Sequence, residues 1–245
     1  MCHIIVIASG KGGTGKSTVA VGLATAFVNR NYKVLLVDCD CGMRGLDIML
    51  DVEKDIVFDA SDAVSGGCDS ESAVYHSTHI QGLCLMPAPF DSDDEISPSV
   101  FSQLIDSIKD NYDYIIIDSP AGVGTGFVTA ATPAQTALVV VNAEPTSVRG
   151  CLNIRKKLIE MGKSDIRLVI NKFNRDVFFG MGLYDDLDAV IDAAQTQLIA
   201  VVPEDYRIVT NVQRGSKGRI WSESGVVFDC LSKRLQGMNI PPAIK

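Results

Sequence analysis

A glycine-rich loop near the start of the chain has the residue types and spacing of a phosphate-binding site. Residues 10–17 read GKGGTGKS and match the pattern G-x-x-x-x-G-K-[ST] between a strand-like and a helix-like run. Glycines let successive backbone N–H groups turn toward one anion, and the start of the following helix adds free N–H groups and the positive end of its dipole. Lys16 is placed to reach the β- and γ-phosphates of a nucleoside triphosphate, and the Ser17 hydroxyl to ligate Mg²⁺. The phosphate-binding residues expected here are Gly10, Lys11, Gly12, Gly13, Thr14, Gly15, Lys16, Ser17 and Thr18.

A carboxylate that completes a magnesium site is expected at Asp118. It ends the segment DYDYIIID, where an apolar run leads to an aspartate and a turn follows in SPAG. An aspartate after a strand is often only a cap, but together with a phosphate loop it is typical of a nucleotide-bound Mg²⁺. The expected metal ligands are therefore Ser17 and Asp118.

Length, charge and composition restrict the class of protein. The chain has 245 residues, 47% of them hydrophobic, and a net charge of −8. The acidic balance disfavours a dedicated polyanion binder, because non-specific nucleic-acid binding depends on clustered lysine and arginine. The apolar runs are far shorter than the roughly 20 residues that span a bilayer. Seven cysteines without the spacing of a disulfide framework favour a reducing compartment, so we expect a cytoplasmic protein.

The elements that must position these residues alternate along the chain. Near-continuous apolar runs predict parallel strands buried on both faces, and runs with helical spacing separate them. Such alternation predicts an α/β fold: a single-domain, doubly wound, mostly parallel sheet with helices on both faces, over residues 1–240, followed by a short tail, 241–245. The expected strands are 4–8, 33–38, 83–87, 114–118, 137–142, 167–171 and 198–202, and the expected helices are 18–30, 97–111, 147–161, 185–194 and 226–238.

The segments SGKGGTGKST, LLVDCDCGMRGLD and IIIDSPAG together resemble the MinD/ParA family of deviant Walker A P-loop ATPases. The likeness is greatest to the MinD branch and extends through DCGMRGLD, EPTSVRG and VPED, so it covers nearly the whole chain. The resemblance implies an ATP hydrolase with ATP and Mg²⁺ as cofactors and weak basal activity. It also implies a nucleotide-dependent dimerisation switch that positions a cellular structure or partner, as in selection of the division site.

The resemblance also assigns roles to individual residues. Lys11 matches the signature lysine, which in the family reaches the phosphates bound by the other subunit of an ATP-dependent homodimer. Asp40 matches the carboxylate that positions the attacking water, so the implied catalytic residues are Lys11, Lys16 and Asp40. Asp118 matches the Walker B aspartate. The segments that hold adenine are matched by Asn171, Lys172, Pro203, Glu204 and Asp205.

Two departures from the MinD branch bear on partners. The C-terminal segment has an apolar stripe at Val227, Leu231, Leu235 and Met238, which predicts a helix docked on the core. Two prolines follow, and no basic amphipathic tail of the kind that binds membranes is seen, so peripheral membrane association stays open. In SVRGCLN, Gly150 and Asn153 stand where division-site relatives tend to carry acidic residues. A regulatory protein partner is expected, but the sequence does not identify it.

Two alternatives use the same fold. A DNA-segregation ATPase of the ParA type needs a basic surface, for which the candidates are Arg149, Arg155, Lys156, Lys157 and Lys163; with this net charge, DNA binding is not the favoured prediction. A carrier of metal or an iron–sulfur cluster needs more ligands than Cys39 and Cys41, and the chain contains no C-x-x-C. Small-residue packing beside the nucleotide is the favoured role of both cysteines.

Five further side chains have more than one possible role. Asp38 serves either to hold the turn after its strand or to act near Mg²⁺. Asp47 is more simply a residue of a helix side or an interface. Arg44 could pair with either aspartate across a dimer. In the segment 176–186, the adjacent residues Phe178 and Phe179 are assigned either to the core or to a contact surface.

Overall fold

One sheet organises the chain. The computed structural model describes residues 2–41, 44–90, 96–205 and 223–241. Within them an eight-stranded sheet has the order β3-β4-β2-β5-β1-β6-β7-β8, with β3 antiparallel to β4 and the other pairs parallel. The strands are β1 (His3–Ala8), β2 (Val34–Asp38), β3 (Tyr75–His76), β4 (Leu83–Met86), β5 (Tyr114–Asp118), β6 (Thr136–Val141), β7 (Asp165–Phe173) and β8 (Gln197–Pro203).

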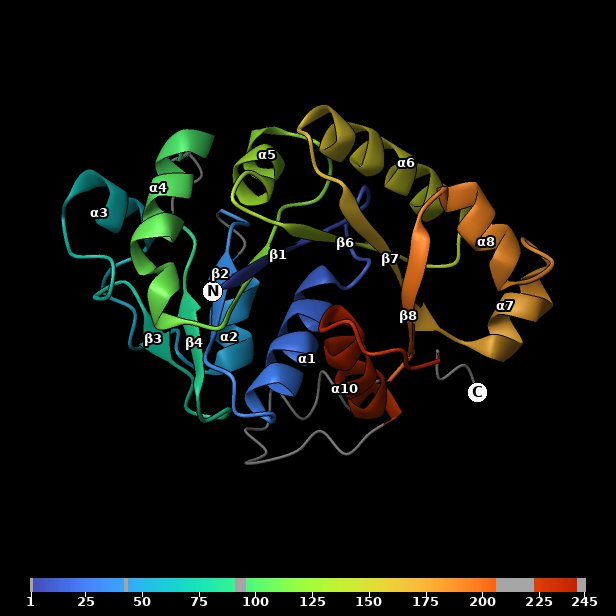
Figure 1. Cartoon of the computed structure of the whole chain (residues 1–245), viewed down its shortest axis with the longest axis horizontal. Helices are drawn as coiled ribbons and strands as arrows, with labels where there is room; N and C mark the ends of the chain where they lie inside the picture. The colour runs from blue at the N-terminus through green and yellow to red at the C-terminus, as the bar shows by residue number, and fades with distance from the viewer. Residues whose placement is uncertain (1, 42–43, 91–95, 206–222, 242–245) are drawn as a thin grey trace.

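Helices cover both faces of this sheet (Figure 1). One face carries α1 (Lys16–Val28), α2 (Gly45–Leu50) and α10 (Glu223–Leu235), and its core includes Phe27, Leu46 and Phe228. The other face carries α3 (Ala60–Ser65), α4 (Pro98–Ile108), α5 (Thr125–Ala131), α6 (Pro145–Glu160), α7 (Arg175–Met181) and α8 (Leu187–Ala194). A short 3₁₀ turn, η1 (Lys109–Asn111), follows α4.

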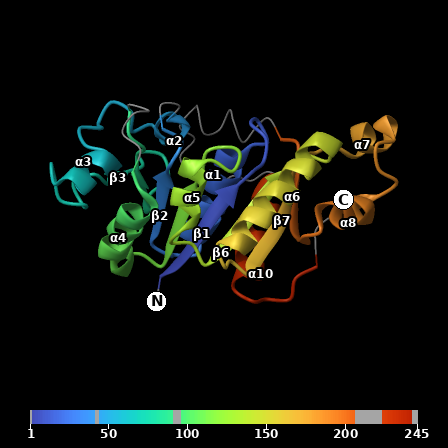
Figure 2. The same ribbon diagram turned by 90° about the horizontal axis from the view of Figure 1, so that it is seen from above.

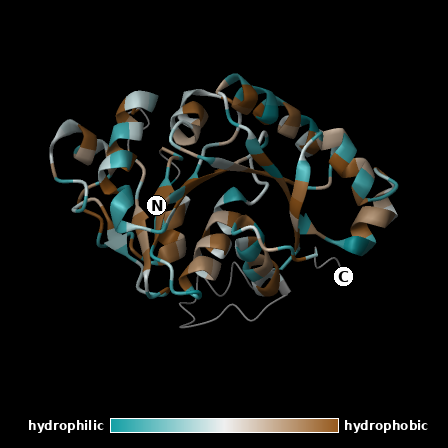
Figure 3. Cartoon of the chain, viewed as in Figure 1, coloured by the Kyte–Doolittle hydropathy of each residue, from teal (hydrophilic) through white to brown (hydrophobic). Residues whose placement is uncertain are grey.

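The strands are apolar throughout because each one contributes to two cores. In β1, Ile5 and Ile7 belong to the core under α1, whereas Ile4 and Val6 belong to the core under α5 and α6. Successive strand side chains point to opposite faces, so a strand covered on both faces has no solvent-facing position. Figure 3 shows the central strands largely in brown, whereas helices such as α6 and α8 alternate between brown and teal.

The direction of the chain reverses at the centre of the sheet. From β1 the chain leads through α1 to β2 on one side, and from β6 it leads through α6 to β7 on the other. The carboxyl ends of β1 and β6, which are neighbours, therefore lie at the topological switch point, where doubly wound folds bind their ligands. Figure 2 shows the central strands and their helices from above.

The fold confirms the doubly wound sheet predicted from the sequence, including its seven parallel strands. The helix predicted from Thr18 begins at Lys16, because Gly15 adopts a left-handed conformation that ends the loop there. The short elements β3, α2, α3, α5 and α7 were not predicted, since none has more than seven residues to show a period. Of the predicted tail 241–245, residues 242–245 lie outside the described residues.

The last helix docks on the first, as the apolar stripe predicted. Val227, Phe228 and Leu231 are buried, whereas Met238 lies beyond the helix and is exposed. The contact is close: a Cβ added at Gly22 of α1 would lie 2.3 Å from the Phe228 ring. Gly22 is thus the residue that lets α10 approach the helix that starts at the phosphate loop.

Gly22→Ala should therefore destabilise the protein, although alanine favours helices by about 1 kcal/mol. The added methyl group overpacks the contact with Phe228, and we expect a net loss of about 1–3 kcal/mol in the free energy of unfolding. Gly180→Ala in α7 is the matched control, because nothing lies within 4 Å of its added Cβ. Urea denaturation measures both; equal stability of the two variants would contradict this packing.

Candidate functional site

The phosphate loop connects β1 to α1 at the carboxyl edge of the sheet. Gly13 and Gly15 have φ angles of 78° and 88°, a region that favours glycine. Lys16 lies in the first turn of α1 and is buried, with only 8% of its surface exposed. The buried hydroxyl of Thr14 has no hydrogen-bond partner among the described residues. The loop thus presents a helix start, a lysine and a free hydroxyl at one point, which suits a phosphate group.

Residues at the end of β7 brace this loop. Asn171 donates a hydrogen bond through Nδ2 to the carbonyl of Thr14 (2.8 Å), and Lys172 donates through Nζ to the carbonyl of Gly13 (2.8 Å). Lys172 has a φ of 54°, which is unusual for a side chain of this size. Because two carbonyls are held by protein donors, they point away from the phosphate position. Asn171 and Lys172, assigned to adenine from the resemblance, thus contact the phosphate loop itself.

The opposite side of the loop rests on α6. A Cβ added at Gly10 would lie 2.3 Å from the carbonyl oxygen of Gly150, and one added at Gly150 would lie 3.0 Å from the Cα of Gly10. Neither position has room for a side chain, so the two backbones are in direct contact. A glycine inside a helix can mark such a close approach, and Gly150, first noted only as a departure at a partner-binding position, has this structural role.

The two lysines of the loop point to different partners. Lys16 is buried in its own loop, whereas Lys11 is exposed and forms an ion pair with Glu144 (Nζ–Oε2 3.2 Å). The Thr146 hydroxyl lies 3.4 Å from the same Nζ atom. Lys11 therefore reaches from the loop after β1 to the start of α6. Glu144 was not singled out from the sequence, because the contact joins segments far apart in the chain.

The carboxylates at the ends of β2 and β5 adjoin the phosphate loop. Asp38 and Asp118 are register partners on neighbouring strands, and the nearby Ser17 hydroxyl lowers the pKa of the Asp118 carboxyl, which opposes the effect of burial. Burial raises the pKa of Asp118 to about 7, and the Asp118 Oδ1 atom is buried without a hydrogen-bond partner among the described residues. A carboxylate held in this state beside a hydroxyl suits a divalent cation with oxygen ligands. Ser17 and Asp118 therefore fit Mg²⁺.

Asp38 and Asp40 have different environments. Both Asp38 oxygens accept backbone hydrogen bonds, from the N–H groups of Asp40 (2.9 Å) and Leu46 (3.4 Å), so Asp38 holds the turn that follows β2. Burial raises the pKa of Asp38 to about 6. Asp40 is only partly buried; burial raises its pKa, and the nearby Lys16 ammonium opposes this shift. Asp40 is thus a carboxylate within electrostatic reach of the phosphate-loop lysine.

Arg44 and Asp47 pair within the same chain. The Arg44 Nε atom lies 3.3 Å from Asp47 Oδ2, and the guanidinium group lies over the exposed ring of Phe90. Both side chains of the pair are largely buried. The ion pair stabilises α2 directly after the Asp40 segment, which accounts for two of the side chains with open assignments.

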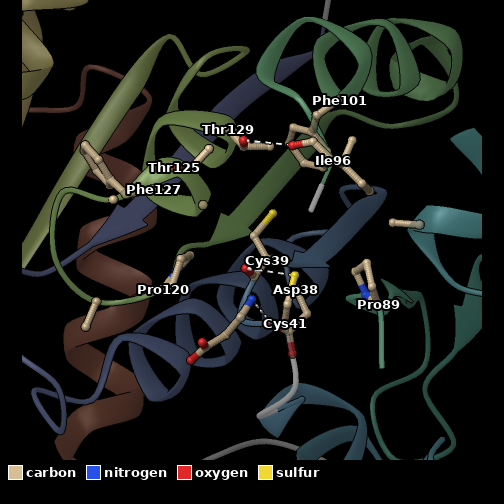
Figure 4. A pocket seen from close by; sticks show the side chains of 15 residues that line it. Asp38, Cys39, Cys41, Pro89, Ile96, Phe101, Pro120, Thr125, Phe127 and Thr129 are labelled. Carbon is tan, nitrogen blue, oxygen red and sulfur yellow. Dashed lines mark hydrogen bonds between the residues drawn. The ribbon is translucent and has the colours of Figure 1, made fainter. Parts of the chain in front are cut away.

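A cavity of about 290 Å³ lies beside the carboxylates, between the ends of β2 and β5 and helices α4 and α5. Figure 4 shows Cys39 and Cys41 on one side of it, with Pro120, Phe127 and Phe101 around the rest. Cys39 is buried, and desolvation raises its pKa well above the ordinary value of a thiol. A protonated thiol packs as a small apolar group, in agreement with the packing role expected for it.

The remaining predicted residues lie at the end of β8 and directly after it. The Glu204 N–H donates to the carbonyl of Phe173 (3.0 Å), and the Asp205 carboxylate accepts a hydrogen bond from Ser224 of α10 (3.2 Å). Pro203, Glu204 and Asp205 thus lie next to the end of β7, where Asn171 and Lys172 brace the loop. The predicted adenine residues therefore lie close together, and of these Asn171 and Lys172 contact the phosphate loop.

Two of the basic residues considered for DNA binding are engaged within the protein. Lys163 donates to the carbonyls of Thr132 and Ala134 at the end of α5 (both 2.7 Å), and Lys157 lies 3.7 Å from Glu160. In the described part of the chain, no group of three or more His, Cys, Asp or Glu residues could hold a metal ion. None of the described helices is long and apolar enough to cross a membrane.

A doubly wound sheet with a braced phosphate loop, a buried lysine, and a hydroxyl and carboxylate at the cation position defines a P-loop nucleoside triphosphatase. A family model described as an AAA domain matches residues 2–170. The septum site-determining protein MinD of Synechocystis sp. is 33% identical over 98% of this chain and 92% of its own length. The chain belongs to the MinD family of ATPases.

Solved structures agree with this assignment. The MinC:MinD cell division protein complex of Aquifex aeolicus gives a TM-score of 0.88, with 32% identity and 98% of each chain covered. The septum site-determining protein MinD of Pyrococcus horikoshii, complexed with Mg-ADP, gives a TM-score of 0.84, with 28% identity and 96% of each chain covered. Nucleotide and Mg²⁺ binding follow from the family and from the phosphate loop of this chain.

Asn171→Ala tests the brace. Without the hydrogen bond to Thr14 the loop loses part of its phosphate-binding shape, and we expect about 3- to 30-fold weaker binding of both ADP and pyrophosphate. Isothermal titration calorimetry with the two ligands measures this. Asn153→Ala, on the exposed side of α6, is the control and should bind as the unchanged protein does. A loss confined to ADP would show that Asn171 acts on the base instead.

Asp118→Asn should stabilise the nucleotide-free protein while removing its response to Mg²⁺. Because the pKa of this carboxyl is about 7, its contribution to stability falls as the pH rises from the unfolded-state pKa, near 4, to 7. We expect the free energy of unfolding of the variant to exceed that of the unchanged protein by about 1–3 kcal/mol at pH 8, and by less at pH 5. Thermal unfolding with and without Mg-ADP is the measurement; a gain that does not depend on pH would contradict the assignment.

Proposed function

We propose that this protein is a MinD-like ATPase that dimerises around two ATP molecules and positions a partner or structure in placement of the division septum. The observation that carries the proposal is the position of Lys11. It lies in the phosphate loop, but its side chain is turned out of the loop and exposed, at the carboxyl edge of the sheet where a second copy can approach.

The same edge of the sheet carries apolar side chains that a second copy could cover. Phe90 follows β4, Val123 follows β5 and Phe179 follows β7, with exposed fractions of 78%, 44% and 54%. The carboxyl ends of parallel strands lie at one edge, so these three residues and Lys11 share it. Phe178 beside Phe179 is buried, and the segment 176–186 therefore serves both the core and this surface.

In the proposed reaction ATP is hydrolysed to ADP and phosphate. Lys16 and the loop N–H groups bind the phosphates, and Asp40 orients the attacking water. Mg²⁺ held by Ser17 and Asp118 would neutralise phosphate charge. Lys11 of the second copy places a positive charge beside the negative charge that develops on the transferred phosphoryl group. Basal activity is weak because this charge is missing in the monomer, and dimerisation or a regulatory protein partner stimulates it.

The adenine base is proposed to be held by Asn171, Lys172 and residues Pro203–Asp205. Asn171 and Lys172 would then contact both the base and the phosphate loop. MinC accompanies MinD in the Aquifex aeolicus complex, and we infer a regulatory protein as the partner of this chain's dimer. The proposed location is the cytoplasm, with peripheral membrane association as a second state. DNA binding is not proposed, since Lys163 and Lys157 are engaged within the protein.

Size-exclusion chromatography of Asp40→Ala with ATP and with ADP, with and without anionic liposomes, tests this function. We expect an ATP-dependent dimer that does not hydrolyse its nucleotide. Lys11→Ala should not form that dimer, and its stimulated hydrolysis should fall about a hundredfold or more. Normal ATP-dependent dimerisation and hydrolysis by Lys11→Ala would show that the lysine does not act across the interface. Sedimentation with the liposomes decides whether the dimer binds membranes.

A further inference from the structure

The cavity beside the carboxylates is enclosed by two segments that reach the expected cation position. One wall is formed by residues 38–41 at the end of β2, where the Cys39 N–H donates to the carbonyl of Asp118 (2.9 Å). Another wall comes from residues 120–129, which begin just after Asp118 and lead into α5. A molecule in the cavity would therefore contact both segments that adjoin the expected magnesium ligand.

Apolar groups form most of the cavity wall. Pro89 and Pro120 follow β4 and β5, Phe101 and Phe127 come from α4 and α5, and Ile96 precedes α4 (Figure 4). Both phenylalanines are buried in the core that surrounds the cavity. Aromatic and proline surfaces on several sides suit a planar ring, because aromatic groups pack well in stacked and edge-to-face arrangements.

The polar groups at the cavity already have partners within the protein. Asp38 accepts from backbone N–H groups through both of its oxygens, and the Thr129 hydroxyl donates to the carbonyl of Ile96 (3.1 Å). The Cys39 side chain is buried and packs as a small apolar group. The carboxylates of Asp38 and Asp40 disfavour an anion beside them. The lining therefore favours a neutral ligand that needs few hydrogen bonds.

We propose that this cavity binds a small neutral aromatic molecule beside the nucleotide, and that the bound molecule slows hydrolysis through Asp40. The cavity volume of about 290 Å³ is close to the lower limit of ligand pockets, about 300 Å³, which restricts the ligand to a small ring system. Asp40 lines the cavity, so a ring there restricts the carboxylate that orients the attacking water. This effect on hydrolysis rests on the proposed function, whereas binding of the ring does not.

Indole is the probe, and methyl nuclear magnetic resonance of the nucleotide-free protein is the measurement. We expect saturable shifts of the Ile96 methyl signals, with a dissociation constant on the order of 0.1–1 mM, because a ligand of few atoms gains limited affinity. The signals of Ile159, which is exposed on α6, should not move. Indole-3-carboxylate should bind about fivefold more weakly or worse, since two aspartates line the cavity.

Ala60→Leu is designed to fill the cavity from α3, and Ala63→Leu is its control. Ala60 lines the cavity, whereas Ala63 lies in the same helix and does not. We expect the dissociation constant of indole to rise about tenfold or more in Ala60→Leu and to stay within about twofold in Ala63→Leu. Urea denaturation shows whether both variants fold. Thr125→Phe fills the cavity from an exposed position of α5 and replaces Ala60→Leu if that variant does not fold.

The titration is repeated with Mg-ADP, and ATP hydrolysis is then measured with and without indole. Binding of indole in the presence of Mg-ADP, together with a fall in kcat of about twofold or more at unchanged KM, supports the proposal. Displacement of indole by Mg-ADP, shifts that do not saturate, or undiminished binding by the filled variant overturns the cavity as a binding site. An unchanged kcat at saturating indole overturns the effect on hydrolysis. A protein that hydrolyses no ATP would overturn the proposed function, and the indole titration would still decide whether the cavity binds a ring.

Discussion

The site depends on one constraint: the backbone N–H groups of the phosphate loop must face a ligand and not the protein. A loop left to itself would satisfy these groups locally, since backbone donors and acceptors are strongly driven to pair. The protein prevents this by fixing the other side of the loop. Asn171 and Lys172 bind its carbonyls, and Gly150 offers a flat surface to Gly10. The left-handed backbone conformation of Lys172 is unfavourable, and the fold retains it because it helps to hold the phosphate loop in this shape.

The carboxylates beside the loop are a second unfavourable feature that the fold retains. Asp38 and Asp118 end adjacent strands and are both nearly fully buried, and their pKa values are raised to about 6 and about 7. Backbone N–H groups satisfy Asp38, whereas one oxygen of Asp118 has no partner in the described part of the chain. The two positions therefore differ in purpose: the first carboxylate organises a turn, and the second is available to a cation. Function and stability are in opposition at the second position.

The sequence predicted those parts of the molecule that rest on local pattern. Continuous apolar runs located the parallel strands because burial on both faces leaves no polar position. The loop motif located Lys16 and Ser17, and the apolar run that ends at residue 118 located Asp118, because each pattern is local. The brace by Asn171 and Lys172, the contact of Gly10 with Gly150, and the pairing of Lys11 with Glu144 were missed. Each joins residues more than a hundred positions apart, and no local period encodes such a distance. The resemblance to a family named Asn171 and Lys172, but not the carbonyls that they hold.

The brace also has a consequence for the order in which the protein becomes competent. Thr14 and Asn171 are 157 residues apart, so the phosphate loop is synthesised long before the side chain that shapes it. Contacts of such long range form late, because the entropy of closing the intervening chain must be overcome first. A nascent chain that has emerged only as far as α5 contains the whole glycine-rich motif but neither α6 nor β7. Nucleotide can therefore stabilise the completed domain, but it cannot guide the folding of its first half on the ribosome.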